Sequence, residues 1–280
     1  MALNDQSTRI RDGEELDAAI IDSYLKAHIP GLSGEPQISQ FPGGASNLTY
    51  LLEYPQQEFV LRRPPFGHKA KSAHDMGREY RILNQLNAGF PYCPKAYVHC
   101  TDESVIGSEF YVMERVNGII LRADLPAELN FSPEQTTQLC KSFIDKLVEL
   151  HNVDYQACGL GDLGKPEGYV ARQISGWSDR YEKALTPDAP LWTEVKAWLN
   201  EKMPADHPKS AIVHNDYRFD NVILDPRDPQ RIIGVLDWEL TTLGDPLMDL
   251  GNTLAYWIEA GDPAPVQLMR RQPSNATGML

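Results

Sequence analysis

The segment 214–221, His-Asn-Asp-Tyr-Arg-Phe-Asp-Asn, constrains this chain more than any other part of the sequence. It spaces His214, Asp216 and Asn221 as H-x-D-x-x-x-x-N, and an apolar run expected to form a strand, 231–236, then leads to Asp237. Phosphoryl transfer from ATP needs these residue types in this order. One Asp orients the acceptor hydroxyl and takes its proton, while an Asn and a second Asp hold Mg²⁺. A solvated turn would explain any single Asp, but it explains the four residues together poorly. The pattern predicts Asp216 as the catalytic residue and Asn221 and Asp237 as metal ligands.

This motif resembles the aminoglycoside phosphotransferase family, relatives of the protein kinases that include the choline kinase-like enzymes. The motif stands where protein kinases carry H-R-D, and residues 243–251 are similar to the D-P-x-x-D-L segment of the family. The resemblance covers nearly the whole chain from about residue 36. It implies an α+β, two-lobed protein kinase-like fold with an antiparallel-sheet N-lobe and a mainly helical C-lobe. It also implies ATP and Mg²⁺ as cofactors and a small-molecule hydroxyl acceptor.

Several residues around the motif are expected to support it. His214 is expected to pack beneath the loop, because a metal hydrolase would need clustered histidines and the other six are scattered. We expect Asp245 and Asp249 to brace the loop, Arg218 to contact the transferring phosphate, and Glu239 to lie behind Asp237.

Composition places the chain among globular proteins. With 280 residues, 42% hydrophobic and 23% charged, it can form one or two domains. No apolar run reaches membrane-spanning length and residues 1–15 lack a signal-peptide core, so we expect a cytoplasmic protein without a membrane partner. The net charge of −13 disfavours nucleic acid as a partner. It suits a cationic acceptor, but ordinary solubility explains it as well. The cysteines form no C-x-x-C pair, so we expect reduced thiols at Cys93, Cys100, Cys140 and Cys158.

Strand patterns cluster early in the chain and helical patterns late, which predicts two lobes. The expected strands are 37–41, 48–54, 58–63, 96–100 and 109–114, of which the first three form an antiparallel meander. The expected helices are 16–28, 74–86, 132–152, 169–183 and 192–202, and a capping box at Ser132 begins the third. We therefore expect an N-terminal helical extension, a nucleotide-binding N-lobe and a helical C-lobe with the catalytic loop, metal and acceptor site: 1–35, 36–117 and 118–280. The polar end, 271–276, indicates a chain shorter than the complete fold or an unusual tail.

A glycine-containing loop between the first two strands has the place of a phosphate-binding loop. Glycine lets backbone N–H groups approach phosphate oxygens, and the neighbouring hydroxyl and amide can add donors. A simple hairpin turn is the alternative. The residues assigned to the nucleotide here are Gly43, Gly44, Ser46 and Asn47.

The third strand is expected to carry the cation for the ATP phosphates, and this chain has arginine where lysine is usual. Alternation places Val60 and Arg62 on one face, so Arg62 is the candidate and Arg63 is expected to be solvated. Glu79, on the following helix, is expected to pair with Arg62; an incidental surface pair is the alternative.

The segment between the lobes, 110–116, is expected to run from a strand into a hinge. By resemblance, backbone groups near Glu114 and Val116 bind the adenine edge and Met113 lines the back of its pocket. Met113 is otherwise a core residue.

The acceptor is the least constrained part of the prediction. Trp177 and Tyr181 belong either to a polar and aromatic wall, with Arg172, Gln173 and Arg180, or to the core. Residues 41–50, 60–65 and 236–239 resemble the kinase-like modules fused to acyl-CoA dehydrogenases, which implies a hydroxyacyl-CoA acceptor. An aminoglycoside, choline or sugar kinase and a non-catalytic nucleotide-binding pseudokinase remain alternatives. ATP against GTP, the number of metal ions and the oligomeric state stay open.

Overall fold

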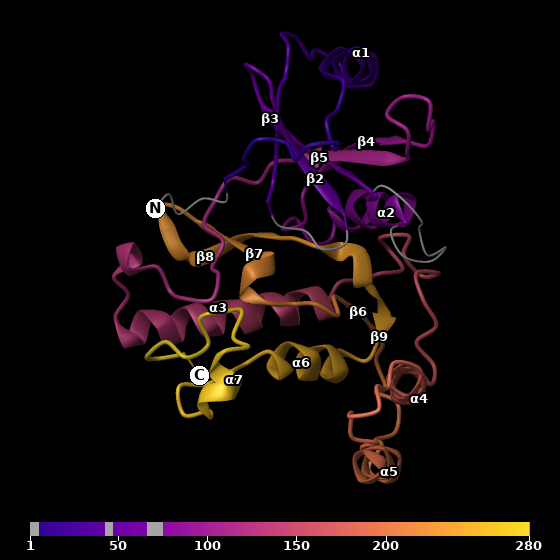
Figure 1. The fold of residues 1–280 in the computed structure, drawn as a ribbon, viewed down its shortest axis with the longest axis vertical. Helices are drawn as coiled ribbons and strands as arrows, with labels where there is room; N and C mark the ends of the chain where they lie inside the picture. Colours follow the sequence, from indigo (N-terminus) through magenta and orange to yellow (C-terminus); the bar gives the residue numbers. More distant parts are fainter. Residues whose placement is uncertain (1–5, 43–46, 66–74, 280) are drawn as a thin grey trace.

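A computed structural model describes residues 6–42, 47–65 and 75–279 and shows a sheet-containing lobe above a helical one (Figure 1). The upper lobe is a five-stranded antiparallel sheet in the order β1-β2-β3-β5-β4. The predicted meander of the first three strands is confirmed. The strands are β1 Gln37–Gln40, β2 Leu48–Glu53, β3 Glu58–Arg63, β4 Ala96–Cys100 and β5 Phe110–Glu114.

Helices cover both faces of this sheet, so strand alternation decides where each side chain of β3 points. The first helix, α1 (Ala18–His28), buries its apolar side chains in the same cluster as Leu61. The second, α2 (Met76–Leu86), packs with Val60 in the cluster that continues into the lower lobe. Arg62 lies opposite Thr49 and shares the α2 side with Val60, as alternation predicts.

The expectation that Arg63 is solvated is wrong. Its face of the sheet is covered by the N-terminal segment, where the Tyr50 hydroxyl donates to the Glu14 carbonyl, and Arg63 is only 2% exposed. Its Nη1 donates to the Ile106 carbonyl oxygen at 3.0 Å. The side chain is therefore a buried part of the upper lobe.

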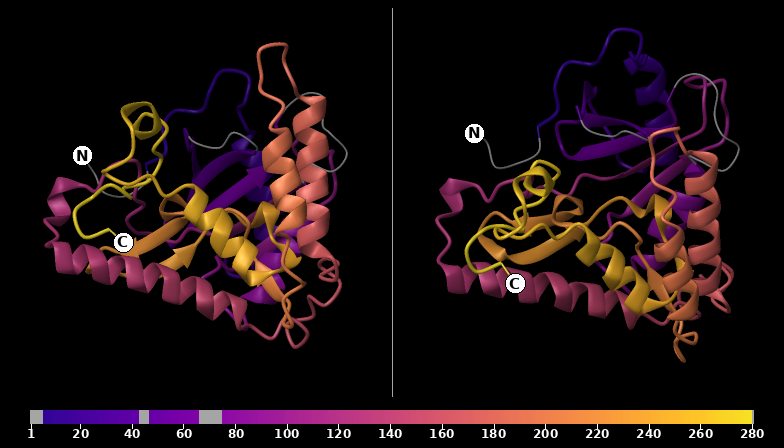
Figure 2. Two further views of the ribbon diagram at one scale, coloured as in Figure 1. Left: turned by 90° about the horizontal axis from the view of Figure 1, so that it is seen from below. Right: turned by 60° about the horizontal axis from the view of Figure 1, so that its bottom comes forward.

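The lower lobe is built on α3 (Pro133–His151), whose apolar side chains at three- and four-residue spacing face the core. The capping box is present: the Ser132 hydroxyl accepts from Gln135 N, and the Gln135 side chain accepts from Ser132 N. Two further helices, α4 (Tyr169–Lys183) and α5 (Thr193–Glu201), lie side by side and stand out from the lobe (Figure 2). Two short ones follow, α6 (Pro246–Ala255) and α7 (Ala264–Gln267).

Two small antiparallel two-stranded sheets lie on α3 and carry the functional loops, and of their strands only the one expected over 231–236 was predicted. Strands β6 (Ala211–Val213) and β9 (Thr242–Gly244) form one, and β7 (Val222–Asp225) and β8 (Asp228–Val235) form the other. The loop 214–221 connects β6 to β7, and the loop 236–241 connects β8 to β9. The two small sheets therefore bring both parts of the sequence motif to one place. The remaining elements are single 3-10 turns: η1 (Ala127–Leu129), η2 (Phe219–Asn221) and η3 (Trp238–Leu240).

Among the described ranges, no helix combines the length and the apolar character that crossing a membrane requires.

Candidate active site

The two loops are joined through their main chains. Leu236 N donates to the Asn221 carbonyl oxygen at 2.8 Å, and the Leu236 carbonyl lies 2.9 Å from His214 Nε2. The Asp249 carboxylate accepts from the backbone N–H groups of His214 and Asn215, at 2.9 and 2.8 Å. His214 thus packs beneath the loop and Asp249 braces it, as expected. Asp245 has a different task, since its carboxylate caps the start of α6.

Asp216 is held in place by Asn221. The amide Nδ2 of Asn221 donates to both the carboxylate Oδ2 and the carbonyl oxygen of Asp216, each at 2.9 Å. Arg218 Nε lies 3.6 Å from Asp216 Oδ1, and the same guanidinium binds Asp220 at 3.0 and 3.1 Å. Burial raises the pKa of Asp216 to about 6, against the lowering effect of Arg218. Asp216 is therefore ionised at neutral pH but unusually basic for a carboxylate.

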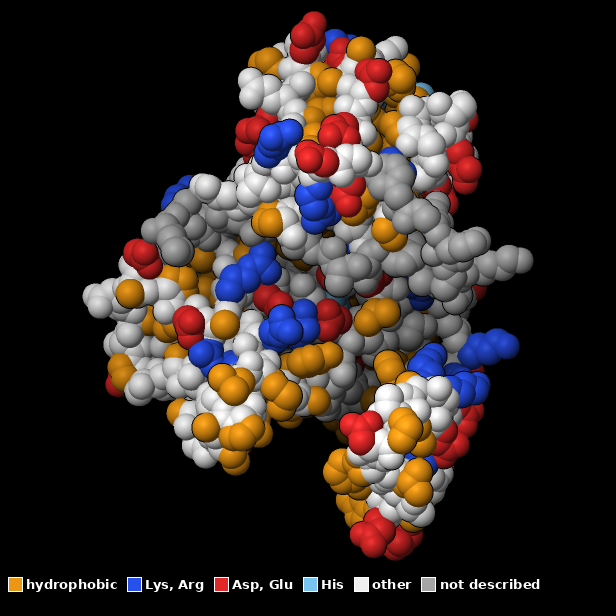
Figure 3. All heavy atoms as spheres, in the orientation of Figure 1, with side chains coloured by type: hydrophobic (Ala, Val, Ile, Leu, Met, Phe, Trp, Pro, Cys, Tyr) orange, Lys and Arg blue, Asp and Glu red, His pale blue; other side chains and the backbone are white. Residues whose placement is uncertain are grey.

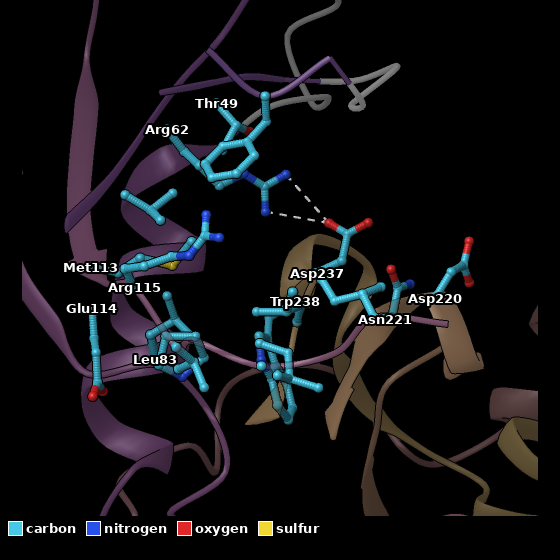
Figure 4. A pocket seen from close by; sticks show the side chains of 18 of the residues that line it. Thr49, Arg62, Leu83, Met113, Glu114, Arg115, Asp220, Asn221, Asp237 and Trp238 are labelled. Carbon is cyan, nitrogen blue, oxygen red and sulfur yellow. Dashed lines mark hydrogen bonds and ion pairs between the residues drawn. The ribbon is translucent and has the colours of Figure 1, made fainter. Parts of the chain in front are cut away.

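Asp237 faces the upper lobe across the pocket. Arg62 Nη1 and Nη2 both lie 3.3 Å from Asp237 Oδ1 (Figure 4). The same guanidinium binds Glu79, which confirms the pairing expected from the sequence. Burial works against the Arg62 charge, but Glu79 and other nearby groups hold the pKa of Arg62 well above its ordinary value. Burial raises the pKa of Glu79, and Arg62 opposes that rise. Geometry favours the ionised pair, because guanidinium and carboxylate are in direct contact.

These residues surround a cavity of about 210 Å³ between the lobes. Asn221, Asp237, Arg62 and Glu79 line it, and so do Met113, Glu114 and Val116 of the hinge segment. The Glu114 N–H donates to the Lys95 carbonyl at 2.8 Å, and Figure 4 shows its side chain turned away from the centre. The remaining walls include side chains that the sequence analysis did not single out: Phe41, Leu83, Arg115, Arg122, Ile223, Leu236 and Trp238.

The predicted phosphate loop is only partly described. Gly43, Gly44 and Ser46 lie outside the described residues. Asn47 is 2% exposed, and its Nδ2 donates to Glu239 Oε2 at 3.0 Å. Its amide is thus directed at the loop that follows Asp237, which makes it a link between the lobes.

Arg78 is a further side chain at the site that no motif indicated. It projects from the first turn of α2, and its guanidinium donates to the carbonyl oxygens of Glu239 and Thr241. Arginine in the first turn of an amphipathic helix is normally solvated, and only the packing of α2 against η3 reveals this contact. Sequence pattern alone therefore could not have found it.

On the acceptor side, the core alternative for Trp177 is wrong. Its side chain is 62% exposed, with the Arg180 guanidinium 4.7 Å from its ring. Tyr181 donates to the Pro190 carbonyl, in the turn between α4 and α5. The α4–α5 pair projects away from the lobe in Figure 2, and Trp177 stays exposed to solvent on it. Within the described ranges, these residues form part of an outer wall.

The donor set at the loops suits a hard divalent cation. Asn221 turns its amide nitrogen to Asp216, which directs the amide oxygen to the other side. Asp237 uses Oδ1 for Arg62, so its Oδ2 completes a pair of oxygen donors on the same pocket. A carboxylate with an amide oxygen is a set that Mg²⁺ accepts when phosphates and water supply the other ligands.

Comparison with known proteins agrees with this geometry. Acyl-CoA dehydrogenase family member 11 from Gallus gallus is 36% identical over 264 residues, which cover 92% of this chain and 33% of the relative. The Homo sapiens protein of the same name is 36% identical over 249 residues, covering 87% and 31%. The chain thus spans about a third of the length of these relatives, and the resemblance to their kinase-like module is confirmed.

Solved structures give the same fold. A Ralstonia eutropha protein, provisionally assigned as an aminoglycoside phosphotransferase, has a TM-score of 0.75 and 37% identity, covering 87% of this chain and 70% of that one. The streptomycin–ATP complex of APH(2")-IIa has a TM-score of 0.55 and 20% identity, covering 84% and 74%. The predicted two-lobed kinase-like fold is confirmed. ATP occurs in the second of these structures, and Mg²⁺ is standard for the family. Residues 37–278 match the family model described as "Phosphotransferase enzyme family", and the chain belongs to that family.

Proposed function

We propose that the chain transfers the γ-phosphoryl group of MgATP to a hydroxyl group of a small molecule. The observation that carries this proposal is the shared position of Asn221. It holds Asp216 on one side and lines the nucleotide pocket beside Asp237 on the other. A proton acceptor and a metal-binding pair thereby meet at one point between the lobes.

In the proposed reaction, Asp216 orients the acceptor hydroxyl and accepts its proton. The hydroxyl oxygen forms a bond to the γ-phosphorus, the bond from that phosphorus to the β,γ-bridging oxygen breaks, and ADP leaves with the electron pair. Bound Mg²⁺ neutralises the developing charge on the phosphates. Asn221 and Asp237 hold that ion, and Arg218, fixed by Asp220, provides a positive charge 3.6 Å from Asp216.

The nucleotide is proposed to bind in the cavity with its adenine against the hinge segment. The Glu114 N–H is engaged by Lys95, so the Glu114 carbonyl and the Val116 backbone are the groups assigned to the adenine edge. Met113 closes the back of the pocket. Arg62, oriented by Glu79, is assigned to the α- and β-phosphates.

For the acceptor we propose a hydroxyacyl-CoA. The relatives' names connect this kind of module to acyl-CoA chemistry. The surface beside the catalytic loop is apolar and has arginine next to the proposed base. Two projections stand at the lower end of the molecule (Figure 1): the α4–α5 pair, and the segment after α6 that carries α7. Figure 3 shows apolar side chains gathered on both of them, with a hollow between them. The exposed apolar residues of these projections include Trp177, Leu191, Trp192, Val195, Trp198, Leu268 and Met269, and Leu247 and Leu254 are exposed on α6 between them in Figure 1.

Both projections begin at residues that touch the catalytic loop. The Tyr169 hydroxyl, at the start of α4, donates to Asn215 Oδ1 at 3.0 Å. The Tyr256 ring, just after α6, lies 4.9 Å from the Arg218 guanidinium. Asp220, a carboxylate that would attract a cationic acceptor, is already bound by Arg218. The apolar side chains of both projections (Figure 3) favour an acceptor with an apolar chain over a polycationic aminosugar.

ADP release by the full chain, measured with MgATP and matched acceptors, tests the proposal. Hydroxyacyl-CoA thioesters of several chain lengths form one set, with the same acyl-CoAs lacking the hydroxyl as controls. An aminoglycoside, choline and a sugar form the second set. We expect hydroxyl-dependent turnover and a mass gain of one phosphoryl group only in the first set, abolished in Asp216→Asn. Turnover only in the second set would contradict the acceptor assignment. MgATP binding without turnover of any acceptor would indicate a pseudokinase.

A further inference from the structure

Asp237 has a backbone conformation that its neighbours must enforce. Its φ and ψ are both 66°, in the left-handed region. Such a conformation is unfavourable for a non-glycine residue and persists only where the surroundings hold it. On the preceding side, Leu236 is fixed by hydrogen bonds to Asn221 and His214. The direction of the carboxylate therefore depends on what fixes the chain after Asp237.

The following side is held from the other lobe. Arg78 on α2 donates from Nη1 to the Glu239 carbonyl oxygen at 3.2 Å and from Nη2 to the Thr241 carbonyl oxygen. Both carbonyls lie at the end of η3, the turn that starts directly after Asp237. Carbonyl groups at the end of a helical turn lack partners within it, and a planar guanidinium can bind two of them at once.

Glu79, the next residue on α2, is connected to the Asp237 side chain through Arg62. Glu79 binds Arg62, and Arg62 contacts the Asp237 carboxylate at 3.3 Å. Glu239 takes part in both sets of contacts: its side chain lies 3.5 Å from Arg62 Nη2, and its carbonyl oxygen accepts from Arg78. Adjacent residues of one helix thus hold the backbone and the side chain of the same loop.

We infer that Arg78 is a positioning residue that sets the direction of the Asp237 carboxylate for the metal ion, and so couples helix α2 of the upper lobe to the metal site. This inference rests on the proposed function, in which Asp237 holds Mg²⁺. Arg78 acts through the backbone of the loop 236–241, and it is not among the described residues that line the nucleotide cavity.

Arg81 provides a matched control. It lies one turn further along α2 and also bridges to the lower lobe, where Nη2 donates to the Gly159 carbonyl at 2.9 Å and Nη1 to Asp162 at 3.1 Å. These partners lie outside the loop 236–241. Arg81→Met therefore removes an interlobe contact of similar chemistry without touching the chain beside Asp237.

The experiment measures metal affinity separately from catalysis. Binding of Mn²⁺ to the full chain in the presence of ATP is followed by electron paramagnetic resonance. Calorimetry gives the ATP affinity with Mg²⁺ and with EDTA, for wild type, Arg78→Met, Arg78→Lys and Arg81→Met. We expect Arg78→Met to weaken Mn²⁺ binding about 10–100-fold, as loss of a metal site's outer supports does. Arg78→Lys should weaken Mn²⁺ binding less than Arg78→Met does. The ATP affinity of Arg78→Met in EDTA and the Mn²⁺ affinity of Arg81→Met should stay at the wild-type values.

Equal losses in Arg78→Met and Arg81→Met, or no loss in Arg78→Met, would overturn the inference. If Arg78→Met does not fold, Arg78→Lys decides, because unchanged Mn²⁺ affinity would then exclude the fork-like contact. Asp237→Ala separates the metal assignment of Asp237 from the positioning role of Arg78. Unchanged Mn²⁺ binding in Asp237→Ala would overturn the metal assignment itself. A loss there beside wild-type binding in Arg78→Met would overturn only the role of Arg78.

Discussion

Arg62 and Asp237 join the two lobes: both terminal nitrogens of the guanidinium lie 3.3 Å from Asp237 Oδ1. The two residues are 175 positions apart and come from a strand of the upper lobe and a loop of the lower one. Glu79 holds the same guanidinium from α2. Because one cation serves carboxylates from both lobes, changes at any of these positions should appear in nucleotide and metal binding.

We expect Asp216→Asn to fold and to bind MgATP but to lose turnover by about 10²–10⁴-fold, the usual contribution of a general base. Asparagine keeps the shape of the side chain and an acceptor for the Asn221 amide. Steady-state kinetics with a true acceptor, alongside calorimetry of MgATP binding, measures both quantities. Near wild-type turnover would remove Asp216 from this role.

Asp237→Ala should weaken MgATP binding more severely than Asn221→Ala. A carboxylate is the stronger ligand for a hard cation, and an amide oxygen contributes no formal charge. Calorimetric titration of both variants with MgATP provides the comparison, with ATP in EDTA as the metal-free control. If both variants bind MgATP as wild type does, neither residue holds the metal.

The two arginines of β3 should behave differently. We expect Arg62→Ala to lose most of the activity and Arg62→Lys to retain part of it, because lysine keeps the charge but not the fork of donors. Steady-state kinetics with varied MgATP tests this. Wild-type kinetic constants in Arg62→Ala would mean that another cation holds the phosphates.

Arg63→Ala should affect stability and leave the kinetic constants of the folded protein unchanged. The variant removes the hydrogen bond from the buried Arg63 guanidinium to the Ile106 carbonyl, and a hydrogen bond from a charged group contributes about 1.5–3 kcal/mol. Urea unfolding and steady-state kinetics of the same preparation separate the two effects. A large rise in KM for MgATP at unchanged stability would contradict the assigned strand register.

Asp216→Asn should also stabilise the metal-free protein at neutral pH. Burial raises the pKa of Asp216 from 3.8 to about 6, so the folded protein binds more protons than the unfolded chain between these values. The free energy of unfolding therefore falls as pH rises through this window and stays lower above it, by up to about 3 kcal/mol. Asparagine does not titrate and lacks this loss.

Thermal unfolding of both proteins in EDTA should give a difference in Tm that is small at pH 4 and grows towards pH 7. Asp220→Asn is the matched control, because it makes the same substitution in the same loop at a carboxylate that Arg218 binds at 3.0 and 3.1 Å. A constant difference between the Asp216→Asn and wild-type curves across this range would contradict the raised pKa.

The sequence by itself determined which residue types are present for the chemistry and in what order. Spacing within one loop fixed Asp216 and Asn221 as neighbours, and strand alternation placed Arg62 on the side of Val60. Helical periodicity located α3, α4 and α5 to within a residue or two. These features depend on local backbone geometry, which a short stretch of sequence specifies.

Only the tertiary structure decided which surfaces are covered and which distant groups meet. Arg63 is buried because the N-terminal segment covers its face, and Trp177 is exposed because the α4–α5 pair projects from the lobe. The contact of Arg78 with the loop after Asp237 depends on how α2 docks on η3. The physical reason is that burial and long-range contacts arise from packing between elements. The residue pattern within one helix or strand does not specify which other element packs against it.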